Sequence, residues 1–123
     1  MNDFEWIENQ IIKWGKDKDL IGEKGNSKRQ VEKTFEELNE LGDALYFENT
    51  DDAIDAYGDI IVTIIIGYAQ FCFEKNINHS RIIDAVNSAY EEIKDRSGFT
   101  LNGTFIKDSL HAAYKMTFPI TSG

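Results

Sequence analysis

The sequence of 123 residues has little cysteine and little proline, with one of each. One cysteine, Cys72, excludes a framework of disulfides within the chain, and its place in an apolar run predicts a small core residue. Residues 1–10 lack the cationic start and apolar stretch of a signal peptide. The longest apolar run, residues 60–73, is too short to span a bilayer and is interrupted by polar and small residues. We therefore expect a cytoplasmic protein with no membrane partner.

Basic residues are also scarce. Lysine and arginine number 13 against 22 aspartates and glutamates, which gives a formal net charge of −9. Such a surface repels a nucleic-acid backbone, and no basic stripe is present for one to follow, so we expect no nucleic-acid polymer as a partner. A small phosphate ligand is still compatible, because a bound divalent cation reverses the sign of the local charge. The two histidines, His79 and His111, stand alone without ligand spacing, and we expect them at the surface.

Helical periodicity of apolar residues is the main pattern in the sequence. Apolar residues recur every three or four positions in residues 3–14, after the predicted N-cap Ser27, and after the predicted N-cap Ser80. Between the first two helices, residues 15–27 are rich in glycine and charge. They predict a long loop of the kind that is often functional.

Residues 52–74 fit a buried strand locally, because they are rich in β-branched residues. Their length favours a helix, which Thr50 and the two aspartates after it would start. A helix that is apolar nearly all round is expected at the centre of the fold.

Near the C-terminus, Asn102 and Gly103 separate two short β-like runs in residues 98–107, which is a hairpin signal. The tail after residue 107 can hold one more short helix. The sequence therefore predicts one all-α domain over residues 1–123, a helical bundle of four to five helices with a short C-terminal hairpin-like turn.

Acidic residues interrupt this apolar pattern in two places. Glu37 and Glu40 share one face of the second predicted helix, with Glu36 further round, and Asp55 and Asp59 share a face of the third. An antiparallel pair of helices would bring these carboxylates together. Hard divalent cations prefer oxygen ligands, and Mg²⁺ is held by few carboxylates plus substrate phosphates. The pattern fits metal-assisted attack of water on a phosphate.

Two plainer interpretations compete with a metal site. The acids can form the solvated face of surface helices, since runs such as EELNE are common. They can also form an acidic seam at a dimer interface, paired with lysines.

The order of the motifs resembles that of the MazG-like all-α nucleoside triphosphate pyrophosphohydrolases, a group that includes dimeric dUTPases and phosphoribosyl-ATP pyrophosphatase. The family signature, EE-x-x-E on one helix and E-x-x-D on the next, is read here as EELNE and DAYGD. A tryptophan, a loop and a Gln-x-x-Lys precede it, GDIIVTIII continues it, and a Lys-x-Arg-x-Gly segment with an Asn-Gly turn closes it. The match runs from about Trp14 to Asp108, and the small phage-type members are the most similar.

The resemblance implies hydrolysis of an NTP or dNTP between its α- and β-phosphates, giving a nucleoside monophosphate and pyrophosphate, with Mg²⁺ or Mn²⁺. It implies that the metal carboxylates are Glu36, Glu37, Glu40 and Asp59, which are also the catalytic residues. One of the first two would orient or deprotonate the attacking water. The sequence departs from the signature at Ala56, where the family has a glutamate, and Asp55, one residue earlier, can replace it.

Five further residues are candidate substrate contacts. Lys94 and Arg96 suit phosphate, although they also suit the C-terminal end of a helix dipole. Lys33 is either a phosphate contact or an ion-pair partner of the acids. Trp14 can stack on a base or belong to the core, and Asn87 can reach the base or the sugar.

The resemblance also implies a homodimer or homotetramer with sites completed across subunits. Two other functions fit the same residues. One is a nucleotide-binding or sensing module with weak or no catalysis, because of Ala56. The other is a non-enzymatic helical adaptor that oligomerises and whose acids only solvate its surface.

Overall fold

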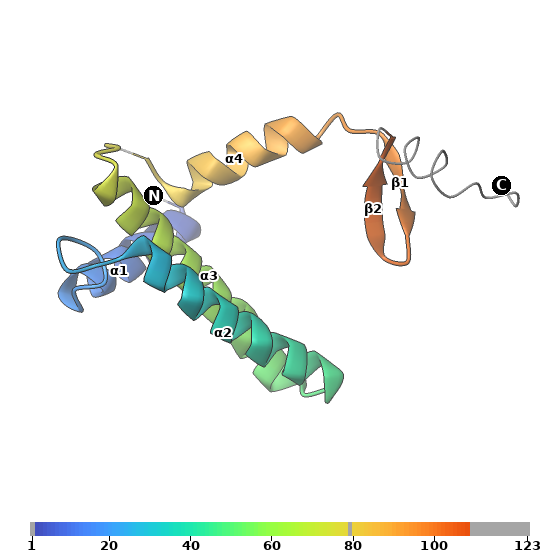
Figure 1. Cartoon of the computed structure of the whole chain (residues 1–123), viewed down its shortest axis with the longest axis horizontal. Coiled ribbons are helices and arrows are strands. Elements are labelled where there is room, and N and C mark those ends of the chain that lie inside the picture. Colours follow the sequence, from blue (N-terminus) through green and yellow to red (C-terminus); the bar gives the residue numbers. More distant parts are fainter. Residues whose placement is uncertain (1, 79, 109–123) are drawn as a thin grey trace, which may run out of the picture. The chain divides into compact units, whose positions relative to one another are not determined.

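The computed structural model describes residues 2–78 and 80–108 (Figure 1). In chain order the elements are helices α1 (Asp3–Asp17), α2 (Ser27–Tyr46), α3 (Thr50–Glu74) and α4 (Ile82–Ile93), and strands β1 (Gly98–Leu101) and β2 (Thr104–Lys107). The predicted all-α fold with a C-terminal hairpin is thereby confirmed. The predicted fifth helix in the tail, His79 and His111 lie outside the described residues.

The chain divides into two compact units, Met1–Ile82 and Ile83–Gly123. The first unit holds α1, α2 and α3, and the second holds nearly all of α4 and the hairpin. The unit Met1–Ile82 carries both acidic motifs, EELNE and DAYGD.

Helices α2 and α3 form a helical hairpin joined by residues 47–49, and α1 packs across α3 (Figure 1). The hairpin core is built from small and aliphatic residues: Leu41, Ala44, Ala53, Ala56 and Ile60. Further along, the Thr34 hydroxyl lies 2.8 Å from the buried Thr63 hydroxyl, which donates to the Ile60 carbonyl at 2.7 Å. Small side chains let the two backbones approach closely, and this fixes which faces of α2 and α3 meet.

Asparagines cap the two helices of this hairpin. The side chains of Asn26 and Asn49 accept hydrogen bonds from the first free backbone N–H groups of α2 and α3. The predicted caps Ser27 and Thr50 were therefore each wrong by one residue. Ser27 instead donates its hydroxyl to Glu74 at 2.5 Å, which ties the start of α2 to the end of α3.

Helix α1 continues past the predicted boundary at Trp14 and ends at Asp17. Gly15 was read as the start of the loop, but it is buried within the helix. A Cβ at that position would lie 2.8 Å from Ile21 Cδ1. Glycine is needed at position 15 because the returning loop packs directly on the helix backbone. The residue with positive φ that ends the helix is Asp19.

The start of α4 also differs from its prediction. Ser80 was the expected N-cap, but its hydroxyl hydrogen-bonds to the Tyr68 hydroxyl. The backbone N–H of Ile82 donates instead to Glu8 Oε2 at 3.1 Å. Glu8 is 1% exposed and forms an ion pair with Arg81 at 3.0 Å. A buried carboxylate from α1 thus satisfies the first N–H of α4.

Helix α3 is not buried all round, contrary to the prediction for a central helix. Its buried residues include Ile65, Ile66 and Gln70, whereas Ile61 and Phe73 are about half exposed. By length and composition alone α3 could cross a membrane, a test that the core helix of a soluble protein also passes.

In the second unit, β1 and β2 pair antiparallel, with Gly98 opposite Lys107 and Leu101 opposite Thr104. The turn residues Asn102 and Gly103 have φ of 49° and 78°. Two positive φ values match the right-handed twist of a hairpin, and asparagine and glycine adopt them most readily. The hairpin predicted from these two residues is confirmed.

Candidate metal centre

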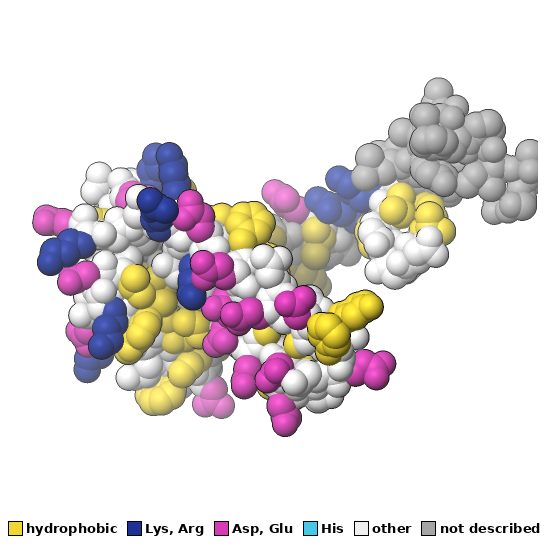
Figure 2. Space-filling view, turned by 60° about the horizontal axis from the view of Figure 1, so that its bottom comes forward, with side chains coloured by type: hydrophobic (Ala, Val, Ile, Leu, Met, Phe, Trp, Pro, Cys, Tyr) yellow, Lys and Arg dark blue, Asp and Glu magenta, His cyan; other side chains and the backbone are white. Residues whose placement is uncertain are grey.

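Three carboxylates meet where α2 and α3 face each other. Glu37, Glu40 and Asp59 each offer an oxygen, and these three oxygens lie within 4.8 Å of one another. Residues 37 and 40 share a helix face because they are three positions apart. The packing of α3 on α2 then brings Asp59 to that face. The space-filling view shows acidic side chains crowded on the hairpin (Figure 2).

Glu37 is the buried member of this cluster, with 7% of its surface exposed. Its Oε2 atom has no hydrogen-bond partner in the described part of the chain. Burial raises the pKa of Glu37, and the neighbouring Glu40 and Asp59 carboxylates raise it further, against the opposing effect of Lys33. An ionised carboxylate here is costly unless a cation compensates it.

Lys33 lies beside the cluster and forms ion pairs. Its Nζ atom is 3.1 Å from Glu36 Oε2 and 3.7 Å from Glu37 Oε1. Glu36, first by hydrogen bonding and then by its charge, raises the pKa of Lys33. Of the two interpretations of Lys33, the structure therefore shows the ion pair. Glu36 itself is exposed and turned to Lys33, so it is not brought into the three-carboxylate cluster.

A cavity of about 430 Å³ opens on one side of the cluster. Its lining combines an aromatic ring, a cation, two carboxylates and apolar side chains: Trp14, Leu20, Gln30, Lys33, Glu37, Asp59, Val62, Thr63 and Ile66. Trp14 is 50% exposed, which places its ring at the cavity rather than in the core. A flat apolar group would find a matching surface here, whereas an anion attached to it would need a cation beside the two carboxylates.

A second cavity, of about 460 Å³, lies toward the connection between α2 and α3 and is acidic. Asp55 lines it together with Glu40 and Asp59, but Asp55 is not one of the three clustered carboxylates. Ala56, which stands where the resembling family has a glutamate, is 3% exposed and belongs to the hairpin core. Asp59 lines both cavities, so the cluster lies at their junction.

Asn87, Lys94 and Arg96 belong to the second unit, which is described by itself. Asn87 is exposed on α4, and Lys94 forms an ion pair with Glu91 at 2.7 Å. Their roles as substrate contacts stay predictions.

Five cavity residues were not predicted as site residues: Leu20, Gln30, Val62, Thr63 and Ile66. All but Leu20 lie three, four or seven positions from Lys33 or Asp59 on the same helix, so helical spacing alone could have found them. Leu20 comes from the loop, and no pattern in the sequence signals it. The loop is held by the buried Gln70, whose amide accepts from the Gly22 N–H at 2.7 Å and donates to the Gly22 carbonyl at 3.1 Å.

The donor set suits a hard divalent cation. Oxygens around an octahedral Mg²⁺ ion lie about 3–4 Å apart, since each is about 2.1 Å from the ion. The three carboxylate oxygens lie within 4.8 Å of one another, and Glu40 and Asp59 are exposed. The unpartnered Oε2 of Glu37 is the observation that favours a cation over simple solvation of the acids.

Comparisons of the chain with models of protein families, with curated proteins and with solved structures gave no match.

Proposed function

We propose that this protein is a divalent-metal-dependent hydrolase that cleaves a nucleoside triphosphate between its α- and β-phosphates, releasing a nucleoside monophosphate and pyrophosphate. The observation that carries the proposal is the buried Glu37 with an unpartnered oxygen, set against Glu40 and Asp59 within 4.8 Å. Three ionised acids on facing helices, one of them desolvated, repel one another, and a cation bound among them would relieve this repulsion.

Glu37, Glu40 and Asp59 would hold the cation, Mg²⁺ or Mn²⁺. When bound, it would neutralise the phosphate oxygens and polarise the phosphorus toward attack. Divalent metal also resolves the sign problem of an acidic protein with an anionic substrate, because the net charge of −9 would otherwise repel it.

The side chains around the cluster then have separate tasks. Glu37 is a better candidate than Glu36 to orient the attacking water, because it belongs to the three-carboxylate cluster, whereas Glu36 is exposed and turned to Lys33. Trp14 would stack on the base in the 430 Å³ cavity. Lys33 would exchange part of its pairing with Glu36 for a phosphate oxygen, since both ligands suit its ammonium.

Membership of the MazG-like group is part of this proposal and rests on the motifs alone. The exposed Asp55 lines the acidic cavity, where it can reach a second cation in place of the glutamate that Ala56 lacks. The proposal therefore requires the three-carboxylate cluster and gives Asp55 only a secondary role as a ligand of a second cation.

The decisive experiment is turnover of a panel of NTPs and dNTPs with Mg²⁺, following monophosphate and pyrophosphate. We expect both products in equal amounts from at least one substrate. Glu40→Gln should lower the rate by roughly 100-fold or more, the size of effect typical for a group acting at the reacting centre. Asp43→Asn is the matched control, because Asp43 lines the acidic cavity without belonging to the cluster.

Two results would point to other functions. Binding of nucleotide with Mg²⁺ but no products would indicate a sensing module, in which Ala56 has removed catalysis. Neither binding nor turnover with any nucleotide would leave the helical adaptor as the better interpretation.

A further inference from the structure

The loop between α1 and α2 contributes one apolar side chain, Leu20, to the cavity of about 430 Å³. All other described residues that line this cavity belong to α1, α2 or α3. A side chain from a loop limits the size of a cavity only if the loop cannot move away, because loops are in general more mobile than the helices they connect. The contacts that hold the loop therefore decide what Leu20 does.

The first set of contacts fixes the loop to the end of α1. The backbone N–H groups of Leu20 and Ile21 both donate to the Gly15 carbonyl, at 2.8 Å and 3.2 Å. The buried side chain of Ile21 packs where a Cβ of Gly15 would be, since that Cβ would lie 2.8 Å from Ile21 Cδ1. Gly15 directly follows Trp14, so Leu20 is held beside the aromatic residue of the cavity.

The second set of contacts comes from Gln70 on α3. Its Oε1 accepts from the Gly22 N–H at 2.7 Å, and its Nε2 donates to the Gly22 carbonyl at 3.1 Å and to Glu74 at 3.0 Å. Gln70 is 1% exposed, so releasing the loop would leave a buried amide without partners. Gly22 is two residues from Leu20, and the loop is thus fixed on both sides of Leu20.

Gln70 also continues the face of α3 that forms the cavity. Asp59, Thr63, Ile66 and Gln70 follow one another at intervals of four, three and four, so they share one side of the helix. The first three line the cavity, and Gln70 holds the loop that brings Leu20 to it. One helix therefore sets where Leu20 lies relative to the carboxylate cluster.

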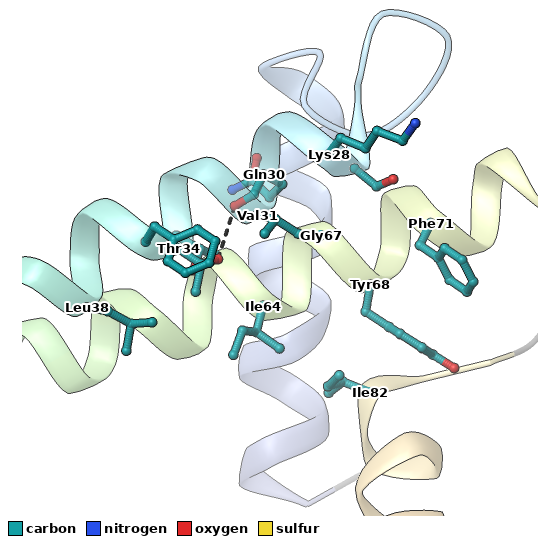
Figure 3. A pocket seen from close by; sticks show the side chains of 13 residues that line it. Lys28, Gln30, Val31, Thr34, Leu38, Ile64, Gly67, Tyr68, Phe71 and Ile82 are labelled. Atoms are coloured by element: carbon teal, nitrogen blue, oxygen red, sulfur yellow. Dashed lines mark hydrogen bonds between the residues drawn. The ribbon is translucent and has the colours of Figure 1, made fainter.

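The wall formed by α2 and α3 is fixed by helix packing. Gln30 and Thr63 line the cavity and also line a separate apolar groove of about 420 Å³ (Figure 3). Thr63 is hydrogen-bonded to Thr34 at 2.8 Å, and Gln30 packs on Gly67, where a Cβ would lie 3.3 Å from its Cγ. A ligand in the cavity thus meets fixed helices on this wall and Leu20 at the loop.

We infer that Leu20, held in place by Gly15 and Gln70, is the residue that selects bases by size, purine against pyrimidine. Gln70 is then a positioning residue, which acts on the ligand only through Leu20. The inference rests on the proposed function, in which the base of the nucleotide stacks on Trp14 in this cavity.

The test compares Leu20→Ala and Leu20→Phe over the NTP and dNTP panel. The measured quantity is the ratio of kcat/KM for the best purine nucleotide to that for the best pyrimidine nucleotide. Leu20→Ala should raise this ratio by roughly 10-fold or more and Leu20→Phe should lower it as much, because a single methylene in an apolar pocket changes discrimination by about 10–200-fold. The change should lie in KM rather than kcat, since Leu20 would contact the base and not the reacting phosphates.

Leu45→Ala is the matched control, because Leu45 is 54% exposed on α2 and is not among the described residues that line the cavity. It should leave the ratio unchanged. An unchanged ratio in both Leu20 variants would overturn the inference.

Gln70→Leu tests the positioning role. It should raise KM, bring the ratio closer to one and leave kcat unchanged. Hydrogen exchange at the Gly22 amide should become at least ~10-fold faster, because its acceptor is removed. Faster exchange with the wild-type KM and ratio would show that Gln70 only stabilises the loop, which would overturn the positioning role.

Binding of nucleosides separates this inference from the proposed function. A wild-type chain that turns over no nucleotide would contradict the hydrolase, and adenosine and uridine, which carry no phosphate, would then test the cavity without metal. Quenching of Trp14 fluorescence in a Trp6→Phe background reports binding, since the chain has two tryptophans. The ratio of the two dissociation constants should shift with Leu20→Ala and Leu20→Phe as described for turnover. No quenching by either nucleoside, or a ratio that neither variant changes, would overturn the inference.

Discussion

At the scale of single residues, two glutamates respond to their surroundings in opposite ways. Burial raises the pKa of Glu37, so its charge opposes folding in the absence of a cation. The Ser27 hydroxyl, donating at 2.5 Å, and then its backbone N–H, at 2.9 Å, lower the pKa of Glu74. The charge of Glu74 therefore favours folding. Glu74 also accepts a hydrogen bond from the Gln70 amide at 3.0 Å. The Glu74 carboxylate therefore links α3 and the start of α2 to the side chain that holds the loop.

The sign of the Glu74 effect gives a pH prediction. Because its pKa in the folded chain lies below the ordinary 4.5, its stabilisation is complete above pH 4.5 and is lost as the pH falls through the lowered value. Glu74→Gln should therefore lower Tm at neutral pH, and the difference from wild type should shrink in acid. Thermal unfolding followed by circular dichroism between pH 7 and pH 3 measures this.

Glu23→Gln is a suitable control for Glu74→Gln. Glu23 is exposed in the loop between α1 and α2, and its side chain makes no hydrogen bond or ion pair to any described residue. Its replacement should change Tm little at any pH. A Glu74→Gln deficit that stayed constant down to pH 3 would show that side-chain shape, rather than charge, provides the stabilisation.

Helical spacing predicted part of the cluster but not its electrostatics. That Glu37 and Glu40 share a face follows from their separation of three residues. That Glu36 turns to Lys33 while Glu37 is buried depends on how α3 lies on α2, which a single helix does not specify. Likewise, Asp55 was expected in the cluster with Asp59; it lines the acidic cavity together with Glu40 and Asp59 but is not one of the three clustered carboxylates.

At the scale of elements, the loop of residues 18–26 is held in one conformation by packing. Gly22 has φ of 127°, and its N–H and C=O both bond to Gln70. A Cβ on Gly25 would approach the Leu20 carbonyl more closely than real Cβ atoms ever do, and would lie 2.6 Å from Gln70 Oε1. Gly25 is therefore required for close approach and Gly22 for its positive φ, and neither is a sign of flexibility.

Gly25→Ala and Gly58→Ala should change stability in opposite directions. Gly25→Ala should lower the free energy of unfolding by at least ~1 kcal/mol, because a backbone atom must move. Gly58 lies inside α3 and a Cβ there would meet nothing within 4 Å, so Gly58→Ala should raise it by about 0.5–1 kcal/mol. Urea denaturation compares the two variants with wild type. Equal effects of one sign would contradict the packed loop.

The elements themselves were largely predictable, because apolar periodicity and the Asn-Gly turn are local signals. Their ends were not. Ser27 and Ser80 have good capping side chains, yet both hydroxyls are used in contacts with α3, at Glu74 and Tyr68. Gly15 was expected to end the first helix because glycine often does so, but it lies inside α1 where the loop packs on it. For all three residues, a packing or hydrogen-bond contact outside the helix turn decides the role that the local rule had assigned to a cap or a stop.

At the scale of the whole molecule, the excess of acid has two components with different salt responses. The diffuse repulsion that comes from the excess of 22 acidic residues over 13 basic residues is screened by any salt. The crowding of Glu37, Glu40 and Asp59 is local and partly buried, where screening is weak. A cation relieves the repulsion among these three carboxylates only when it coordinates them directly. The two components can be separated by comparing ions at the same ionic strength.

Mg²⁺ should therefore raise Tm more than NaCl of equal ionic strength does. Binding to the folded chain alone stabilises it by about 2.7 kcal/mol when Mg²⁺ is at 100 times its dissociation constant. Glu37→Gln should raise Tm without metal, because a buried charge is removed, and should abolish the extra Mg²⁺ shift. Glu36→Gln, which changes an exposed acid outside the cluster, should keep that shift. Equal shifts with Mg²⁺ and NaCl in the wild type would mean that the acids only solvate the surface, and both the metal centre and the proposed hydrolase would be wrong.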